Sequence, residues 1–148
     1  MKFHFIFKES QSKEITNIIA HPDNEKLLKE QFLSVEIKIE LNELRTNRNV
    51  QVYLSDIEAI SSFTHKSKVR LTNGEGYYIK GRLKDLEYLG NHGLNRINNQ
   101  EMINIKEVTH YSIDSGSRLI VNCKSGNDYI VSRYYAKSIK EKLKCGLI

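Results

Sequence analysis

Turn signals recur along the chain from Val50 onward, and this rhythm limits the fold more than any other feature of the sequence. Asn73-Gly74 is a strong hairpin signal, because both residues tolerate the positive φ that a tight antiparallel turn needs. Ser115-Gly116 and Ser125-Gly126-Asn127 mark two further turns. Short runs rich in branched apolar residues separate these signals at spacings of roughly ten residues, which is typical of an all-β domain. The sequence therefore predicts a mainly β fold over its C-terminal part.

Two helices interrupt the predicted strands. Leu83, Leu86 and Leu89 recur every three residues, which predicts a short helix over residues 82–89 that the following glycines end. A second helix is predicted over residues 133–143. The predicted strands cover residues 51–54, 57–64, 68–72, 76–80, 94–97, 102–111, 118–123 and 128–132.

The beginning of the chain has a different pattern. Residues 2–8 alternate phenylalanine with other side chains and residues 35–41 alternate branched apolar with charged ones, so both are predicted strands. Residues 12–20 and 24–32 have the apolar spacing of short helices, with Pro22 between them. We predict a small α+β N-terminal extension over residues 1–46, in β-α-α-β or β-α-β order, that dimerises or regulates the protein. The polar stretch 42–49 is the predicted linker to a second domain over residues 47–148.

The net charge of +5 is unevenly distributed. Residues 1–46 contain 7 Lys and Arg against 8 Asp and Glu, whereas residues 47–148 contain 16 against 10, so the second part alone carries +6. A basic domain suits a polyanionic partner such as nucleic acid, although an excess of this size also occurs on ordinary solvated surfaces. Charge alone leaves both interpretations open.

Several functional classes find no support in the sequence. Cys123 and Cys145 lack a close partner, which indicates a reducing cytoplasm rather than a disulfide framework or a zinc site. No uncharged stretch approaches the roughly 18 residues of a membrane span. There is no glycine-rich phosphate loop, no paired histidine motif and no recognisable nucleophile motif. We therefore expect no catalysis, metal, cofactor or small-molecule substrate.

Alternating cations occupy one predicted strand of the basic part. Lys66, Lys68 and Arg70 alternate along one side of that strand or of the loop that leads into it, where they can neutralise successive phosphates. Lysines also protect exposed edge strands from aggregation, so a solvated edge is the alternative.

A loop with the sequence Arg96-Ile97-Asn98-Asn99-Gln100 carries four side chains suited to paired hydrogen bonds. Asparagine and glutamine can bind adenine through two hydrogen bonds, and arginine can bind guanine in the same way. Asparagine also tolerates left-handed φ, so an ordinary turn is the alternative.

The last predicted strand runs into the last helix through Val131-Ser132-Arg133-Tyr134-Tyr135. Ser132 can cap this helix, whose N-terminal amides attract phosphate. The lysines that follow also complement the helix dipole, but that role does not explain Arg133 at the helix start, where a cation is disfavoured. These lysines are Lys137, Lys140, Lys142 and Lys144.

The order of these features resembles that of the LytTR DNA-binding domains of bacterial regulators. The resemblance covers residues 50–143 and is carried by VYLSDIEAI (52–60), GRLKDL (81–86), LNRI with IN (94–97, 103–104) and VSRY (131–134). It implies an elongated set of small β-sheets with short helices, whose loops enter successive major grooves of DNA.

The resemblance implies base contacts at His65, Asn99 and Arg133. We expect neighbouring polar side chains to contact the DNA backbone or to support the loops. These are Lys66, Lys68, Arg70, Arg96, Asn98, Gln100, Ser132, Tyr134, Lys137 and Lys140. The sequence Asn98-Asn99-Gln100 departs from the family pattern of His, a basic residue or Asn, and Ser, so the preferred operator cannot be carried over.

The resemblance also implies partners. Family members usually bind paired direct repeats in double-stranded DNA, and short members are often held in check by a membrane protein. Residues 1–49 are too few for a receiver domain, so we expect a stand-alone transcription regulator that is a homodimer at least on DNA and has a membrane-bound inhibitory protein. A protein-interaction adaptor or anti-regulator of the same fold, without DNA binding, is the alternative.

Overall fold

The computed structural model describes residues 2, 4–14, 16–32 and 37–146, and the chain divides into two compact units, Met1–Val35 and Glu36–Ile148. The first unit contains a short 3-10 helix, η1 (Pro22–Asn24), followed by α1 (Glu25–Phe32). The helix predicted over residues 24–32 is therefore confirmed, apart from its first residue.

Of the strand predicted over residues 35–41, the part from Lys38 onward is confirmed, and residues 35 and 36 lie outside the described residues. The other two elements predicted for the N-terminal extension, both in the first unit, are wrong where the structure describes them. There is no strand among residues 4–8 and no helix among residues 12–14 and 16–20. Apolar side chains of this unit face solvent, with Phe7 91% and Ile19 97% exposed. Short helices and isolated strands are stabilised mainly by burying an apolar face, and no described residue of this unit belongs to a hydrophobic core. The apolar periodicity of the N-terminal extension was therefore not sufficient to predict a folded β-α-α-β unit.

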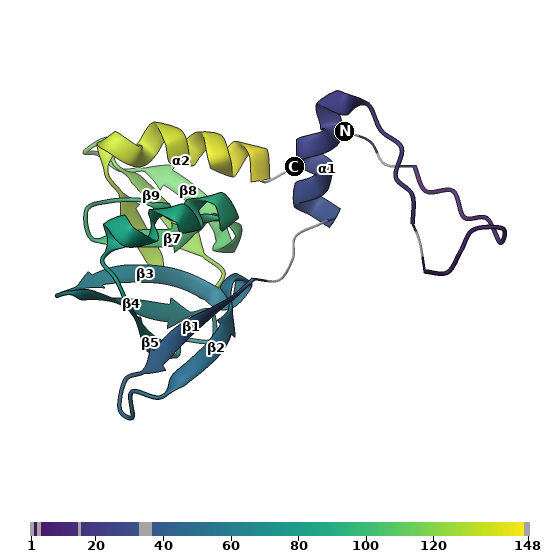
Figure 1. The fold of residues 1–148 in the computed structure, drawn as a ribbon. Coiled ribbons are helices and arrows are strands. Elements are labelled where there is room, and N and C mark those ends of the chain that lie inside the picture. The colour runs from purple at the N-terminus through teal and green to yellow at the C-terminus, as the bar shows by residue number, and fades with distance from the viewer. Residues whose placement is uncertain (1, 3, 15, 33–36, 147–148) are drawn as a thin grey trace. The chain divides into compact units, whose positions relative to one another are not determined.

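The second unit is built on two antiparallel sheets (Figure 1). The seven-stranded sheet has the order β2-β1-β5-β4-β3-β7-β6, and the three-stranded sheet has the order β10-β9-β8. The strands are β1 (Lys38–Glu43), β2 (Asn49–Tyr53), β3 (Ile57–Phe63), β4 (Lys66–Leu71), β5 (Gly76–Ile79), β6 (Leu94–Arg96), β7 (Glu101–Asn104), β8 (Val108–Ile113), β9 (Leu119–Cys123) and β10 (Asp128–Val131). The predicted mainly β class is confirmed.

Helices connect and cover these sheets. The long 3-10 helix η3 (Leu83–His92) follows β5, and α2 (Arg133–Gly146) follows β10. Two short 3-10 turns, η2 (Leu54–Asp56) and η4 (Ile105–Glu107), join strands. η4 interrupts the strand predicted over residues 102–111. The two halves of that predicted strand are therefore β7 and β8, which belong to different sheets.

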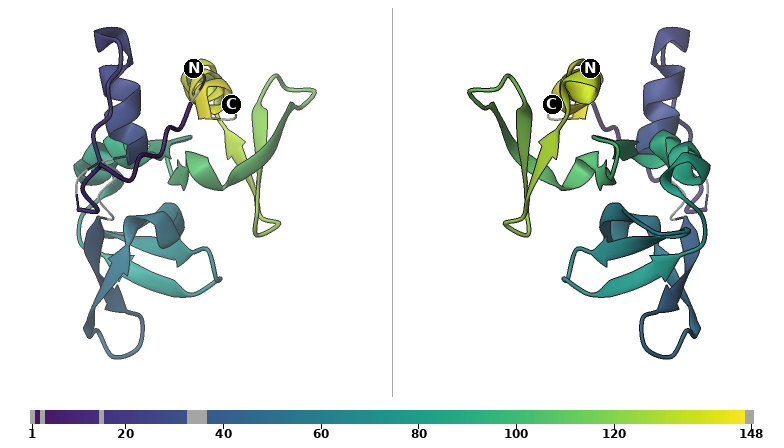
Figure 2. Two further views of the ribbon diagram at one scale, coloured as in Figure 1. Left: turned by 90° about the vertical axis from the view of Figure 1, so that its right-hand side faces the viewer. Right: turned by 90° about the vertical axis from the view of Figure 1, so that its left-hand side faces the viewer.

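Two hydrophobic cores hold the second unit together. The first packs η3 on the seven-stranded sheet and contains the predicted stripe Leu83, Leu86 and Leu89, all buried. The second packs the three-stranded sheet and α2 against residues of β3 and β7. Ile139 and Leu143 of α2 are each 1% exposed in this core, and both views of Figure 2 show α2 end-on beside the three-stranded sheet. Two sheets are thus fixed side by side by buried side chains.

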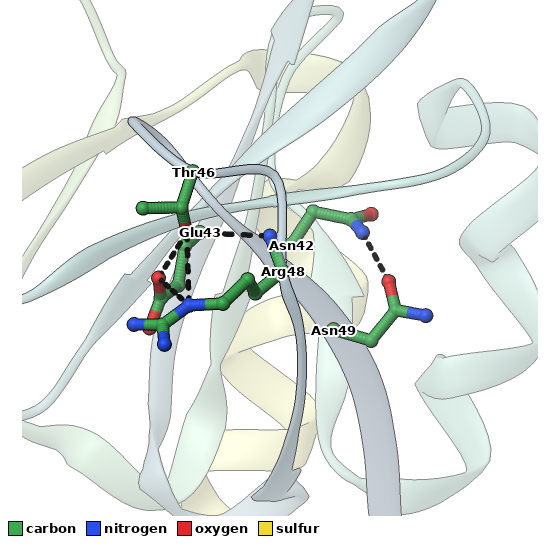
Figure 3. Close-up of polar contacts among 5 residues, drawn as sticks. All are labelled: Asn42, Glu43, Thr46, Arg48 and Asn49. Atoms are coloured by element: carbon green, nitrogen blue, oxygen red, sulfur yellow. Dashed lines mark hydrogen bonds and ion pairs between the residues drawn. The ribbon is translucent and has the colours of Figure 1, made fainter.

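The predicted linker over residues 42–49 is wrong, because these residues form the strand ends and turn of the β1–β2 hairpin (Figure 3). Arg48 Nε donates to Glu43 Oε2 at 3.1 Å, and the Thr46 hydroxyl donates to the same carboxylate. The hydrogen bond from Thr46, together with those from Arg48, holds the pKa of Glu43 below its usual value. Asn42 Nδ2 donates to Asn49 Oδ1 at 2.6 Å. A polar hairpin turn has the same composition as a linker. Here it connects β2 to β1, which also pairs with β5 in the seven-stranded sheet.

Candidate nucleic-acid interface

Main-chain hydrogen bonds join the three segments that carry the predicted base-contacting residues. At the end of β3, Ser62 N donates to Gln100 O at 2.8 Å. At the start of α2, Ser132 N donates to Ile97 O at 2.8 Å. The β6–β7 loop, residues 97–100, is therefore bonded on one side to the end of β3 and on the other to the start of α2. In Figure 1 the arrowhead of β3 and the first turn of α2 both lie at the left of this unit.

His65 is exposed at the tip of the two-residue turn between β3 and β4. The turn is closed by the paired residues Phe63 and Lys66. Thr64 has a φ of 52°, which is uncommon for a β-branched residue. Arg82 Nη2 lies 3.0 Å from His65 Nδ1, so the ring has a partner from the segment that leads into η3.

The predicted phosphate stripe along β4 divides into two parts. Lys66 Nζ sits 3.8 Å above the centroid of the Tyr78 ring, and Lys68 is exposed on the same face. Arg70 lies about 13 Å from Lys66 by the rise of a strand. Its charge also helps to lower the pKa of the buried Glu58 carboxylate. Only Lys66 and Lys68 are thus beside the turn that carries His65.

Arg96 organises the β6–β7 loop from within. Its Nη1 forms an ion pair with Glu87 Oε1 at 3.1 Å. Its Nε and Nη2 donate to the carbonyl oxygens of Asn98 and Asn99 at 3.3 and 3.1 Å. The guanidinium therefore holds the loop rather than pointing away from it.

The two asparagines of this loop differ. Asn98 Nδ2 donates to Ile130 O at 2.9 Å, and its Oδ1 accepts from Gln100 N at 2.8 Å, so it ties the loop to β10. The side chains of Asn99 and Gln100 are exposed. Asn99 is consequently the member of the pair that presents its amide at the surface.

Arg133 is the first residue of α2 and is exposed. Its Nε and Nη2 both donate to Gly116 O in the β8–β9 turn, at 3.2 and 2.9 Å. Asp114 fixes this turn by accepting from the backbone N of Gly116 and of Arg118 at 2.9 and 2.8 Å. The bond to the Arg118 backbone is the main reason that the pKa of Asp114 lies below its usual value. The positive end of a helix disfavours the Arg133 guanidinium, and the hydrogen bonds to the Gly116 carbonyl oxygen offset that repulsion.

The other predicted residues lie along α2. Ser132 O accepts from the backbone N of Tyr135 and Ala136, each at 3.0 Å, which starts the helix. Tyr134 is 85% exposed and meets the Tyr135 ring edge-on. Lys137 is exposed and Lys140 is half-buried.

The sequence did not identify two groups that contact the predicted base-contacting residues. These are the Arg82 side chain and the Gly116 carbonyl oxygen. Each meets its partner, His65 or Arg133, across 17 residues of chain. No periodicity relates residues at that separation, so the pairs become visible only in the folded structure.

Other kinds of site were sought in the part of the chain that the structure describes. Among those residues no group of three or more His, Cys, Asp or Glu is placed to hold a metal ion. No helix there is long and apolar enough to cross a bilayer. Burial, followed by the charge of Glu58, raises the pKa of the Cys123 thiol to about 12, which leaves it protonated and inert at neutral pH.

Comparison with known proteins agrees with this architecture. The family described as the LytTr DNA-binding domain matches residues 47–144. No curated protein matches the chain. A solved LytTr DNA-binding domain from Bacillus cereus superposes with a TM-score of 0.63 at 19% sequence identity, over 74% of this chain and 98% of that domain. At 19% identity the superposition shows only a shared fold. The family match is stronger evidence, because it covers more than half of the chain. The chain therefore belongs to the LytTR family of DNA-binding domains.

Proposed function

We propose that this protein is a transcription regulator that recognises a specific sequence of double-stranded DNA by presenting the β3–β4 turn, the β6–β7 loop and the start of α2 to the major groove. The observation that carries the proposal is that His65, Asn99 and Arg133 are exposed on segments that main-chain hydrogen bonds hold together. Arginine suits guanine and asparagine suits adenine, because each pair can form two hydrogen bonds at the base edge. We assign base recognition to these three side chains.

The surrounding groups would position the DNA backbone. Lys66, Lys68, Lys137 and Lys140 are cations that flank the three segments, and lysine neutralises phosphate without reading sequence. The N-terminus of α2 adds backbone amides that favour an anion. We assign the other predicted residues, Arg70, Arg96, Asn98, Gln100, Ser132 and Tyr134, a supporting role.

The decisive test is selection of bound sites from random duplex DNA, followed by affinity measurements over a range of salt concentrations. We expect an enriched motif arranged as paired direct repeats. If the four lysines each contact one phosphate, the slope of log affinity against log salt on a single repeat should be about −4 for each bound copy of the chain, and Lys137→Ala should reduce its magnitude by about 1. Lys124→Ala, an exposed lysine in the β9–β10 turn, is the matched control and should leave the slope unchanged. Absence of both an enriched motif and a salt dependence would favour the protein-interaction adaptor.

We also propose that residues 1–35 mediate dimerisation in the cytoplasm, and that a membrane-bound inhibitory protein acts on this segment. Its exposed Phe7, Ile18, Ile19 and Leu27 supply apolar surface that a second protein can bury. Analytical ultracentrifugation should show that the full chain associates and that a shortened chain starting at Glu36 remains monomeric. Equal association of the two chains would rule out dimerisation through this segment.

A further inference from the structure

We propose that Arg82 determines sequence specificity indirectly. It holds His65 in the neutral tautomer that carries its hydrogen on Nε2 and can donate that hydrogen to DNA. The inference rests on the proposed function, because it requires His65 to read a base. Arg82 Nη2 and His65 Nδ1 are 3.0 Å apart, which is hydrogen-bond distance. Arg82 is a positioning residue in this scheme.

The chemistry of the two side chains sets the direction of this hydrogen bond. A guanidinium carries five N–H donors, has no acceptor and stays protonated in proteins. His65 Nδ1 must therefore be the acceptor and carries no hydrogen. A neutral imidazole has a single ring N–H, so that hydrogen is on Nε2. The contact with Arg82 thus selects one of the two neutral forms of His65.

Arg82 is itself held in place against β4. The hydroxyl of Ser67, a fully buried residue of β4, donates to Gly81 O at 2.9 Å. Gly81 has a φ of 108°, which glycine adopts without strain. The Asp85 carboxylate accepts from Arg82 N at 3.0 Å. The backbone of Arg82 is therefore anchored to the strand that begins immediately after His65.

The selected form of His65 restricts which base edges it can bind. An Nε2–H donor matches the acceptors of the major groove, which are guanine O6 and N7, adenine N7 and thymine O4. It does not match the amino group of cytosine, which is itself a donor. A ring free to flip would also present Nδ1 as an acceptor and would lose this distinction. Arg82 therefore favours an acceptor-bearing base opposite His65.

The test is a double-mutant cycle on the full chain, measured as base preference in selected duplex DNA. His65→Ala defines the base pair at which preference disappears. Arg82→Ala should weaken base preference about 3- to 10-fold at that same base pair, which corresponds to the net contribution of one hydrogen bond. Base preference at other positions should not change. The double variant should match His65→Ala alone, because coupled residues are not additive. Arg82→Lys, which keeps a charged donor, should restore part of the preference.

Lys84→Ala is the matched control, since it removes one exposed cation two residues away in the same segment. It should leave preference at that base pair intact. The inference is overturned if Arg82→Ala weakens all sequences by the same factor, as a phosphate contact would, or if its effect adds independently to that of His65→Ala.

A spectroscopic measurement covers the case in which Arg82→Ala fails to fold. Nitrogen-15 spectra of the unaltered chain, with His65 assigned, should show an unprotonated Nδ1 and a protonated Nε2 in the neutral ring. The reverse pattern overturns the inference while leaving the proposed function standing. Failure of the unaltered chain to select any DNA sequence refutes the proposed function, and the specificity role of Arg82 with it.

Discussion

Replacing Glu58 with alanine is expected to lower the free energy of unfolding by about 3 kcal/mol. Glu58 is 1% exposed, and its carboxylate accepts from the hydroxyl of Ser125, from Asn127 Nδ2 at 3.0 Å and from Tyr129 Oη at 2.6 Å. These donors lie in or beside the β9–β10 turn, so the carboxylate on β3 joins the two sheets. The variant would leave the buried Tyr129 hydroxyl without its partner, which costs more than the net value of the bond itself.

Thermal unfolding checks this expectation, with a decrease in melting temperature of roughly 10 °C at neutral pH. Glu141→Ala, which removes an exposed carboxylate from α2, is the control and should change stability by less than about 0.5 kcal/mol. A Glu58→Ala chain that melts with the unaltered protein would show that the network contributes nothing to stability.

The same network predicts a pH dependence. Burial raises the pKa of Glu58, but the hydrogen bonds from Ser125, Tyr129 and Asn127 and the charge of Arg70 together bring it below the ordinary value of 4.5. The stabilisation is therefore fully present above that ordinary value and is lost as the pH falls through the lower pKa of the folded protein. The stability difference between the unaltered chain and Glu58→Ala should shrink in acid.

Replacing Arg133 with alanine is expected to reduce affinity for the selected operator about 5- to 150-fold, which corresponds to the loss of one paired contact to a base. Preference should relax at one base pair only. Arg133→Lys should restore it only in part, because a lysine ammonium can donate to O6 and N7 of guanine but lacks the planar, fixed fork of the guanidinium. Fluorescence anisotropy at fixed salt, with operator and scrambled duplexes, measures both effects.

Lys137→Ala serves as the comparison within the same helix. It should weaken binding to both duplexes by a similar factor, since a phosphate contact carries no sequence information. Unchanged operator preference in Arg133→Ala would remove Arg133 from the set of base-reading residues.

Much of the fold of the second unit could be predicted from its sequence, because local signals and tertiary packing agree there. Asn73-Gly74 and Ser125-Gly126 lie in turns between paired strands. Leu83, Leu86 and Leu89 predicted a helix through a spacing of three, and the structure shows a 3-10 helix, whose three residues per turn suit that spacing. Among the described residues of the first unit, α1 was predicted correctly, whereas the other apolar patterns there leave side chains such as Phe7 and Ile19 exposed.

The candidate site was less accessible to prediction. The positions of His65, Asn99 and Arg133 came from a resemblance and not from any local pattern. Arg96 and Asn98 looked like candidates for DNA contact, yet Arg96 donates to carbonyl oxygens of the loop and Asn98 donates to Ile130 O in β10. Side-chain type shows what a residue can bond to, whereas the choice between DNA and the protein's own backbone depends on neighbours that are distant in sequence.

The bonds from Ser62 N to Gln100 O and from Ser132 N to Ile97 O involve only main-chain atoms. Substitutions at the exposed tips therefore leave the spacing between the three segments unaltered. Under the proposed mode of recognition, single replacements at those tips would change the preferred operator without compensating changes in the core.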